Sequence, residues 1–82
     1  MHFVYILQSE RDSSFYIGQT RNVEERLIRH NEGRERYTKL RCPWKLVHAE
    51  SFGSRLEAIR REREIKKRKS RKYIFDLIGS GS

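Results

Sequence analysis

The sequence predicts a small α+β domain with the element order strand, strand, helix, strand, helix, helix. Three observations lead to this prediction. A chain of 82 residues is long enough for one domain only. Two short apolar runs near its start have the composition of β-strands, and two later segments begin with side chains that can cap a helix. We expect the domain to span residues 1–78, and residues 79–82 (GSGS) to form a flexible tail.

Residues 3–7 form the first expected strand. The run FVYIL is continuous, contains β-branched and aromatic residues, and is too short for a helix, so it is typical of a buried strand. Residues 15–17 form a second short run that stops at Gly18. Gly18 is consistent with a bulge or with the close approach of another group to the backbone. The polar residues 10–14 favour a turn, and we therefore expect an antiparallel hairpin.

The first helix is expected to begin after Asn22 and to end near His30. Asn22 can cap the free backbone amides, and Glu25, three residues later, can complete a capping box. Gly33 then provides a stop signal. Residues 32–41 have no clear periodicity and are predicted to be a loop.

A third strand and two further helices complete the domain. Residues 44–49 alternate loosely and favour a strand, with Leu46 and His48 on the same face. Ser54 begins a second capping box (SRLE), which opens a long stretch without Gly or Pro and predicts a helix. Residues 71–78 are expected to form a short terminal helix that packs on the core.

The charge of the chain favours a nucleic acid as its partner. The chain has 19 Lys and Arg against 11 Asp and Glu, a net charge of +8, which suits a polyanion. Residues 55–72 hold ten of the basic and three of the acidic residues and so carry +7. This segment can bind phosphates by releasing counterions, or it can be a solvated face that keeps the protein soluble. The basic residues expected to contact nucleic acid are Arg21, Lys39, Arg61, Lys66 and Lys69.

Other features argue against several classes of protein. Cys42 is the one cysteine, so it cannot form an internal disulfide, and with three scattered histidines it shows no zinc-site spacing. No apolar run approaches the roughly 18 residues of a membrane span. The start of the chain lacks the basic region and long apolar stretch of a signal peptide. We therefore expect a cytoplasmic protein that does not enter a membrane.

One acidic residue, Glu62, does not fit its surroundings. A helical wheel places it in the middle of an apolar stripe. An unpaired carboxylate there would cost several kcal/mol, so it needs a partner. The partner could be an arginine in a partly buried salt bridge, or Mg²⁺, which accepts a lone carboxylate together with water and phosphate. The wheel does not separate the two. The residues of the stripe are Leu56, Ala58, Ile59 and Ile65.

Four other side chains are candidates for chemistry. Tyr5 and Tyr16 lie in the two hairpin strands, where facing tyrosines ordinarily pack in the core. Arg26 and His30 are one turn apart and share a face of the first helix. A guanidinium suits phosphate and an imidazole can move a proton near neutral pH, although such a pair can equally be a surface feature.

These features form a specific combination. It consists of VYIL at residues 4–7, YIG at residues 16–18, an arginine ten residues past the second tyrosine, and a glutamate in a basic helix. The combination closely resembles the GIY-YIG endonuclease superfamily. Over residues 3–78, the segments RLIRHN, YTKL, PWKLVHAESF and AIRREREIKK are similar to the small stand-alone bacterial members. The resemblance implies a three-stranded antiparallel sheet flanked by helices, and hydrolysis of DNA phosphodiester bonds with Mg²⁺ or Mn²⁺.

The resemblance assigns a role to each matched position. Tyr5 matches the tyrosine of the first motif and Tyr16 that of the second. Arg26 matches the family arginine, which would bind the phosphate, and Glu62 matches the glutamate that would hold the metal. His30 matches a histidine found in part of the superfamily. One of the tyrosines, with help from His30, would orient or deprotonate the attacking water.

The chain departs from the family pattern in three places. The first motif reads VYI instead of GIY but keeps the tyrosine. Gln19 follows YIG where some relatives have a lysine, which removes one phosphate contact. No asparagine follows Glu62 where some larger members place one.

The resemblance favours an endonuclease with weak sequence selectivity or with selectivity for DNA structure. Branched or single-stranded DNA would be its substrate, in repair or recombination, and a protein partner could target it; the oligomeric state stays open. The alternative is an inactive DNA- or RNA-binding module that uses residues 55–72. A third hypothesis is a protein-interaction adaptor that uses exposed aromatic residues such as Tyr37 and Trp44.

Overall fold

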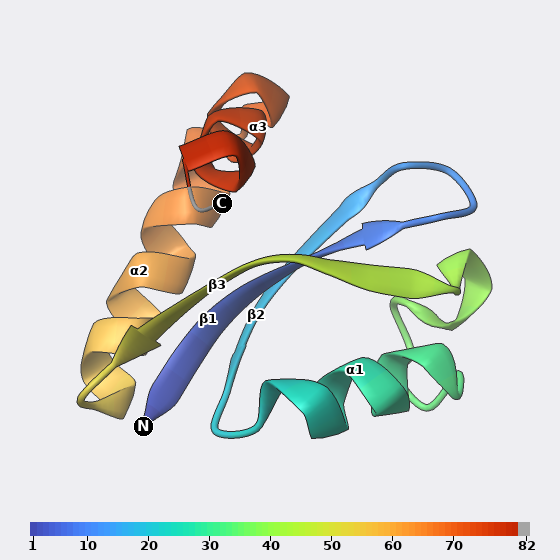
Figure 1. The fold of residues 1–82 in the computed structure, drawn as a ribbon, viewed down its shortest axis with the longest axis horizontal. Helices are drawn as coiled ribbons and strands as arrows, with labels where there is room; N and C mark the ends of the chain where they lie inside the picture. The colour runs from blue at the N-terminus through green and yellow to red at the C-terminus, as the bar shows by residue number, and fades with distance from the viewer. Residues whose placement is uncertain (81–82) are drawn as a thin grey trace.

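The computed structural model describes residues 1–80 and confirms the α+β fold and the predicted order of elements (Figure 1). Positions 81 and 82 of the expected tail lie outside the described residues, and the last helix includes Gly79 and Ser80. No helix within the described residues is long and apolar enough to cross a membrane. The elements are β1 (His2–Ser9), β2 (Phe15–Thr20), α1 (Val23–Asn31), a 3-10 helix η1 (Lys39–Arg41), β3 (Trp44–Phe52), α2 (Arg55–Arg68) and α3 (Arg71–Ser80).

The strands form one three-stranded antiparallel sheet in the order β2-β1-β3. Because β1 is the central strand and helices cover both faces of the sheet, its apolar run is continuous. Val4 and Ile6 pack with residues of α2 and α3, whereas Tyr5 and Leu7 pack with residues of α1. Figure 1 shows α1 on one side of the sheet and α2 and α3 on the other. The sheet therefore divides the core into two clusters.

The strands extend beyond their apolar runs, and β3 contains a bulge. Hydrogen bonding to β1 continues β2 past Gly18 to its end at Thr20. In β3, the register shifts so that Leu46 lies opposite Leu7 and His48 lies opposite Ile6. Neighbouring residues of β1 face opposite sides of the sheet, so the prediction that Leu46 and His48 share a face is wrong. The extra residue of the bulge accounts for the error.

Local capping sets the helix starts as predicted. The Asn22 side chain accepts a hydrogen bond from the backbone amide of Glu25 at 3.1 Å. The Ser54 hydroxyl accepts one from the amide of Glu57 at 3.3 Å. At the other end of α2, Lys69 adopts the left-handed conformation with φ of 49° and ends the helix.

The apolar stripe of α2 is narrower than the helical wheel predicted. Ala58 and Ile65 are buried against the sheet. Leu56, however, is 56% exposed, so its assignment to the stripe is wrong. Leu56 precedes Ala58 by two residues and therefore lies on nearly the opposite side of the helix. Glu62 remains on the buried side, with a side chain that is 19% exposed.

Candidate active site

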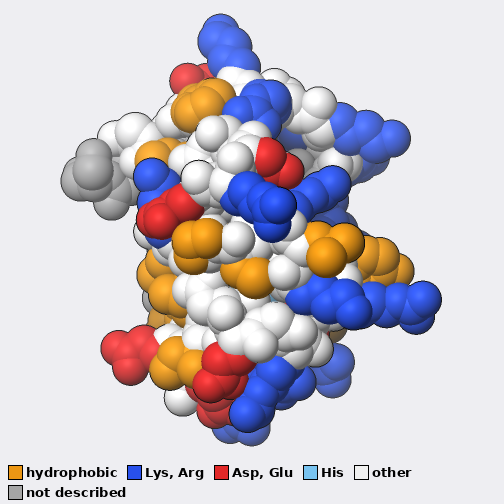
Figure 2. All heavy atoms as spheres, turned by 90° about the vertical axis from the view of Figure 1, so that its right-hand side faces the viewer, with side chains coloured by type: hydrophobic (Ala, Val, Ile, Leu, Met, Phe, Trp, Pro, Cys, Tyr) orange, Lys and Arg blue, Asp and Glu red, His pale blue; other side chains and the backbone are white. Residues whose placement is uncertain are grey.

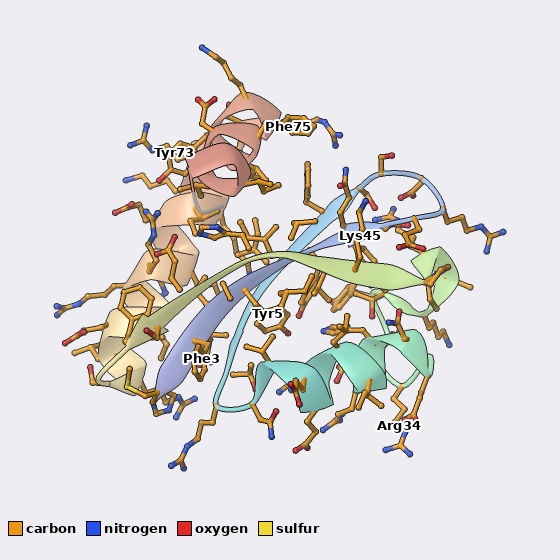
Figure 3. The ribbon with its side chains drawn as sticks, viewed as in Figure 1. Phe3, Tyr5, Arg34, Lys45, Tyr73 and Phe75 are labelled. Carbon is orange, nitrogen blue, oxygen red and sulfur yellow. The ribbon has the colours of Figure 1, made fainter. Side chains whose placement is uncertain are left out.

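A chain of hydrogen bonds links β1, α1 and the loop after α1. The Tyr5 hydroxyl lies 3.1 Å from Nε2 of His30, and Nδ1 of His30 lies 2.7 Å from the Thr38 hydroxyl. Each of these three residues is at most 1% exposed. Both ring nitrogens therefore have partners, and the imidazole is held in one orientation. His30 is a buried group rather than a surface feature. Figure 3 shows Tyr5 between the sheet and α1.

Gly18 provides the space that the Tyr5 phenol occupies. The two residues lie opposite each other in the β1–β2 pair. A Cβ atom at position 18 would lie 2.7 Å from the Tyr5 hydroxyl oxygen and 2.8 Å from its Cζ. Both distances are shorter than van der Waals contact, so a residue with a side chain would push the phenol away from His30. The close approach considered for Gly18 is thus confirmed.

Tyr16 packs on the other side of the same imidazole. Its ring centroid lies 4.8 Å from that of His30 and 6.2 Å from that of Tyr5. The Tyr16 ring also packs edge-on against Trp44, at a centroid distance of 6.4 Å. Tyr16 is half-buried, whereas Tyr5 is fully buried. The tyrosines therefore form part of the core, as cross-strand neighbours ordinarily do, and also border the buried histidine.

Tyr5, Tyr16 and His30 form the aromatic cluster of the site. Arg26 extends a guanidinium from α1, one helical turn before His30. Its Nη1 lies 3.7 Å from Oε1 of Glu35, and Nε of Arg29 lies 3.3 Å from the same oxygen. Glu35 therefore holds two arginines, whose side chains are 36% and 43% exposed. Both arginine side chains are partly exposed, although Nε of Arg29 is buried.

Sequence analysis missed Thr38 and Trp44, which hold His30 in place from the side of the loop after α1. Thr38 bonds to His30 through its hydroxyl, and its carbonyl oxygen accepts a hydrogen bond from Nε1 of Trp44 at 2.9 Å. Trp44 is 4% exposed, so its assignment as an exposed adaptor residue is wrong. Residues 32–41 have no periodicity that would give a register. The one available signal was Glu35, an acid among basic residues.

Burial controls the protonation states of Tyr5 and His30. It raises the pKa of Tyr5, and the neighbouring Tyr16 adds to the increase. The charge of Arg26 lowers the pKa of Tyr5, and the charge of Glu62 raises it. Burial lowers the pKa of His30. At pH 7 the pair is therefore a neutral phenol bonded to a neutral imidazole.

Glu62 extends from α2 and has a lysine as its partner. Its Oε2 accepts a hydrogen bond from Nζ of Lys66, one helical turn later, at 2.6 Å. Of the two partners that the helical wheel left open, an arginine and a metal ion, the structure shows no arginine at Glu62 within the described residues; the partner is Lys66, whose side chain is 53% exposed. This lysine, which was expected to contact nucleic acid, neutralises Glu62 in the structure.

The chemistry of Glu62 fits a hydrated divalent metal. Residues 1–80 contain no group of three or more His, Cys, Asp or Glu side chains that could hold a metal ion. A lone carboxylate suits Mg²⁺ or Mn²⁺, because such an ion can keep water and take further oxygen ligands from a phosphate. Lys66 forms a half-exposed ion pair, which costs little to break. Glu62 is therefore able to accept such an ion.

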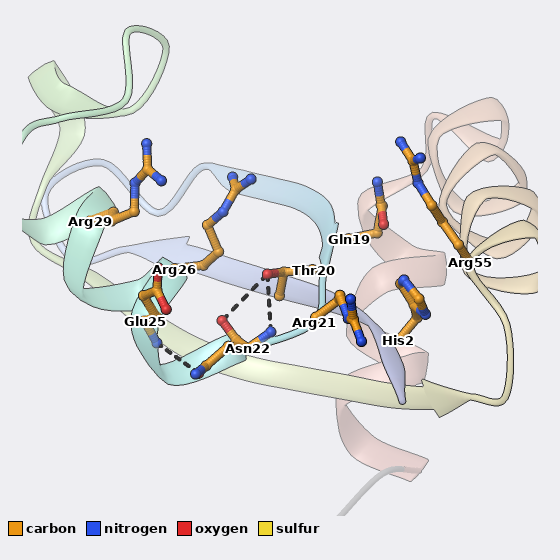
Figure 4. Close-up of a pocket in the computed structure, with 9 residues that line it drawn as sticks. All are labelled: His2, Gln19, Thr20, Arg21, Asn22, Glu25, Arg26, Arg29 and Arg55. Atoms are coloured by element: carbon orange, nitrogen blue, oxygen red, sulfur yellow. Dashed lines mark hydrogen bonds between the residues drawn. The ribbon is translucent and has the colours of Figure 1, made fainter.

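A cleft of about 500 Å³ adjoins the site at Arg26. Figure 4 shows that residues of α1, the end of β2 and the start of α2 form its walls. Glu25 is its one acidic lining residue, whereas four of the lining residues are arginines. Tyr5, Tyr16 and Glu62 do not line this cleft. Arg26 is the candidate site residue that the cleft includes. We call it the arginine cleft; its lining residues are His2, Gln19, Thr20, Arg21, Asn22, Glu25, Arg26, Arg29 and Arg55.

Arg61 is held inside the protein, away from the arginine cleft. Its Nε and Nη2 donate to the Glu50 carboxylate at 2.8 and 3.1 Å, and its Nη1 donates to the Tyr73 hydroxyl at 2.9 Å. Glu64 pairs with the same guanidinium. The hydrogen bonds that Arg61 donates to Glu50 are the largest cause that raises the pKa of Arg61. Each of the three guanidinium nitrogens therefore has a partner within the protein.

The other basic residues expected to contact nucleic acid lie far from one another in the fold. Arg21 lines the arginine cleft. Lys39 is exposed in η1, and Lys69 is exposed at the end of α2. The structure therefore does not gather the predicted contacts into one surface.

Comparison with known proteins identifies the family to which this chain belongs. The sequence model of the GIY-YIG catalytic domain family matches residues 1–74, so the chain belongs to this family of nuclease-type domains. A UPF0213 protein of Staphylococcus saprophyticus is 42% identical over 81 residues, which cover 98% of this chain and 96% of the relative. A UPF0213 protein of Natronomonas pharaonis is 42% identical over 82 residues, which cover 95% of each chain.

A solved structure agrees with these matches. The solution NMR structure of the UPF0213 protein from Bacillus halodurans is 38% identical to this chain, with a TM-score of 0.61. The similarity covers 99% of this chain and 86% of the other. The family resemblance and the fold expected from the sequence are therefore confirmed.

Proposed function

We propose that the protein is a divalent-metal-dependent endonuclease that hydrolyses phosphodiester bonds in DNA. The observation that carries this proposal is that Tyr5 and Tyr16 both pack on His30, one helical turn from Arg26 on α1. Glu62 adds a carboxylate on the buried side of α2. Phosphodiester hydrolysis needs an activated water, positive charge at the phosphate, and help for the leaving oxygen. These residues include a side chain suited to each requirement.

Arg26 is proposed to bind the non-bridging oxygens of the phosphate. Its guanidinium can form two parallel hydrogen bonds to a phosphate, and its contact with Glu35 is long, at 3.7 Å. The arginine cleft begins at this residue and includes Arg21, Arg29 and Arg55. The phosphates next to the scissile one would lie in this cleft.

Tyr16 is better placed than Tyr5 to act on the attacking water. Tyr5 is 1% exposed, its hydroxyl is engaged with His30, and burial raises its pKa. Tyr16 is half-buried, and its ring packs on the same imidazole. We assign to Tyr16 the orientation of the water, and to Tyr5 and His30 the positioning of Tyr16. Thr38 holds the imidazole in turn.

Glu62 is proposed to hold Mg²⁺ or Mn²⁺. A bound ion would supply positive charge to the phosphate and to the departing 3′ oxygen. The protein would contribute one carboxylate, that of Glu62, which α2 holds in a position mostly shielded from water. Lys66 would give up its ion pair with Glu62 and remain free to contact the DNA backbone.

Nicking of supercoiled plasmid tests this proposal. We expect the wild type to nick in Mg²⁺ or Mn²⁺ and to be inactive in EDTA. Glu62→Gln keeps the shape of the side chain but removes its charge, so it should slow nicking by about 100-fold or more. Tyr16→Phe should cause a comparable loss without a loss of thermal stability. Glu57→Gln, at an exposed acid of the same helix, is the matched control and should nick like the wild type.

Two outcomes would decide against parts of the proposal. Nicking by Glu62→Gln at the wild-type rate would remove its role in metal binding. A plasmid that is shifted in a gel but not nicked in either metal would favour the alternative, a DNA- or RNA-binding module that uses residues 55–72. A panel of duplex, flap, four-way and single-stranded substrates would then show whether the structure of the DNA is selected.

A further inference from the structure

Tyr37 is the most exposed of the large hydrophobic residues that the structure describes. Its side chain is 85% exposed, and Leu40, three residues later, is 75% exposed. Both lie between the end of α1 and the start of β3. Large apolar groups this exposed and this close in the chain are typical of a surface that binds another molecule.

The backbone that carries Tyr37 is fixed. The next residue, Thr38, is 1% exposed and bonds to both His30 and Trp44. The amides of Thr38 and Lys39 both donate to the carbonyl oxygen of Glu35, at 3.2 and 3.0 Å. An exposed ring on an ordered backbone loses little conformational entropy when it binds a partner. The same hydrogen bonds connect the position of Tyr37 to the imidazole of the candidate site.

The charges around Tyr37 favour a polyanion as the partner. Residues 34–41 contain four basic residues and one acid. Arg36 and Lys39 are exposed, and neither forms an ion pair with any of residues 1–80. Figure 2 faces this end of the molecule and shows hydrophobic side chains next to Lys and Arg. An exposed ring between free cations is the arrangement by which proteins bind unpaired nucleotides: the ring stacks on a base and the cations contact phosphates.

The loop adjoins the arginine cleft through Glu35, which contacts two of the lining arginines. Figure 4 shows the segment after α1 beyond Arg29, at the end of the cleft away from Arg55. Glu35, which pairs with Arg26 and Arg29, belongs to this segment. A strand whose phosphates follow the arginines past Arg26 would therefore continue toward Tyr37.

We propose that Tyr37 is a stacking platform for an unpaired base of the DNA strand that lies across the site. Arg36 and Lys39 contact the phosphates on either side of that base. The inference rests on the proposed function for the identity of the strand. It adds that the substrate has an unpaired nucleotide beside the bond that is cut, because a base inside a duplex does not offer its face to a side chain.

Binding, measured without turnover, tests the inference. The wild type and variants are titrated in EDTA with a fluorescent oligothymidylate and with an abasic strand of the same length. Tyr37→Ala should weaken binding to the oligothymidylate by about 5- to 100-fold, with no change for the abasic strand. Tyr37→Trp should bind at least as tightly as the wild type. Phe75→Ala, at a second half-exposed aromatic residue, is the matched control and should bind like the wild type. Thermal melts confirm that each variant folds.

Several results would overturn the inference. These are equal affinity of Tyr37→Ala and the wild type for the oligothymidylate, an equal loss on both strands, and absence of binding by the wild type. Tyr37→Leu keeps an apolar side chain but cannot stack, so full affinity in that variant would contradict base stacking and favour a protein partner. If the wild type fails to nick plasmid but Tyr37→Ala loses affinity for the bases only, the nuclease proposal fails and the stacking proposal stands.

Discussion

His30 is the residue on which the geometry of the candidate site depends most. Its two nitrogens contact Tyr5 and Thr38, and its ring packs against Tyr16. It therefore joins two strands and a loop through a single side chain. Because the imidazole is buried, protonating it would place a positive charge in the core, which costs free energy.

Protonation of His30 should destabilise the protein in mild acid. Burial lowers the pKa of His30 in the folded protein, whereas in the unfolded chain it is near 6.5. Between the two values the unfolded chain binds more protons, so stability is present above about pH 6.5 and is lost as the pH falls toward the folded pKa. Thermal melts from neutral to mildly acidic pH should show this loss in the wild type.

The comparison variant is His30→Gln, which cannot take up the proton. It should be less stable at neutral pH, but its melting temperature should depend less on pH in this window. Glu50 should not contribute to the pH dependence of stability in this window. Although burial opposes it, hydrogen bonds from Arg61 and His48 hold the pKa of Glu50 below its usual 4.5, so its contribution is lost only below that pH. Identical pH dependence in the wild type and His30→Gln would assign the proton to another group.

At the scale of secondary-structure elements, Arg61 joins β3, α2 and α3. Its guanidinium binds Glu50 of β3 and the Tyr73 hydroxyl of α3. Figure 3 shows Tyr73 on α3. The guanidinium carbon of Arg68 lies 4.5 Å from the centroid of the Tyr73 ring. These contacts fasten the terminal helix next to the small apolar cluster on that side of the sheet.

Arg61→Met should therefore reduce stability rather than DNA binding. The variant keeps much of the side-chain volume but leaves the Glu50 carboxylate and the Tyr73 hydroxyl without their partner. We expect a loss of about 1–3 kcal/mol in the free energy of unfolding, since side chains that are 20% and 24% exposed retain some hydration. Urea unfolding measures this loss, and the affinity for DNA at fixed salt should not change.

The control for this prediction is Arg63→Met, at an exposed position of the same helix. Its effect on stability should be within about 0.5 kcal/mol. Unchanged stability in Arg61→Met together with weaker DNA binding would show that Arg61 contacts nucleic acid, as the sequence predicted.

At the scale of the whole molecule, the position of the charge matters more than its amount. Residues 55–72 contain nearly all of the net charge, but the fold uses part of it internally, in the ion pairs of Arg61 and Lys66. The arginine cleft combines residues from α1, β2 and α2 that are far apart in the chain. It presents several guanidiniums around one hollow next to Arg26.

The arginine cleft should account for more of the salt dependence of DNA binding than the exposed face of α2. Each phosphate contact contributes about 0.9 to the slope of log affinity against log salt. Replacing both Arg21 and Arg55 with Gln should therefore reduce the slope by about 2. Replacing both Arg63 and Lys67, exposed on α2, makes the same change in charge and should reduce it less. The opposite order would identify α2 as the main interface.

Local patterns predicted most of the fold, because capping and periodicity depend on residues that are close in the chain. Asn22 and Ser54 begin their helices as expected, and the apolar run of β1 is a buried central strand. The errors arise where distant contacts decide the outcome. The bulge in β3 depends on pairing with β1, and the exposure of Leu56 depends on which side of α2 meets the sheet.

The sequence by itself determined the family, the order of elements and the chemical types in the candidate site, since motif spacing and residue identity do not depend on coordinates. The tertiary structure alone decided which groups meet. It joined Tyr5 to His30, 25 residues away, gave Glu62 a lysine partner, and turned Arg61 inward while it left Tyr37 exposed. The physical reason is that burial and ion pairing depend on distances across the folded chain, which no local pattern encodes.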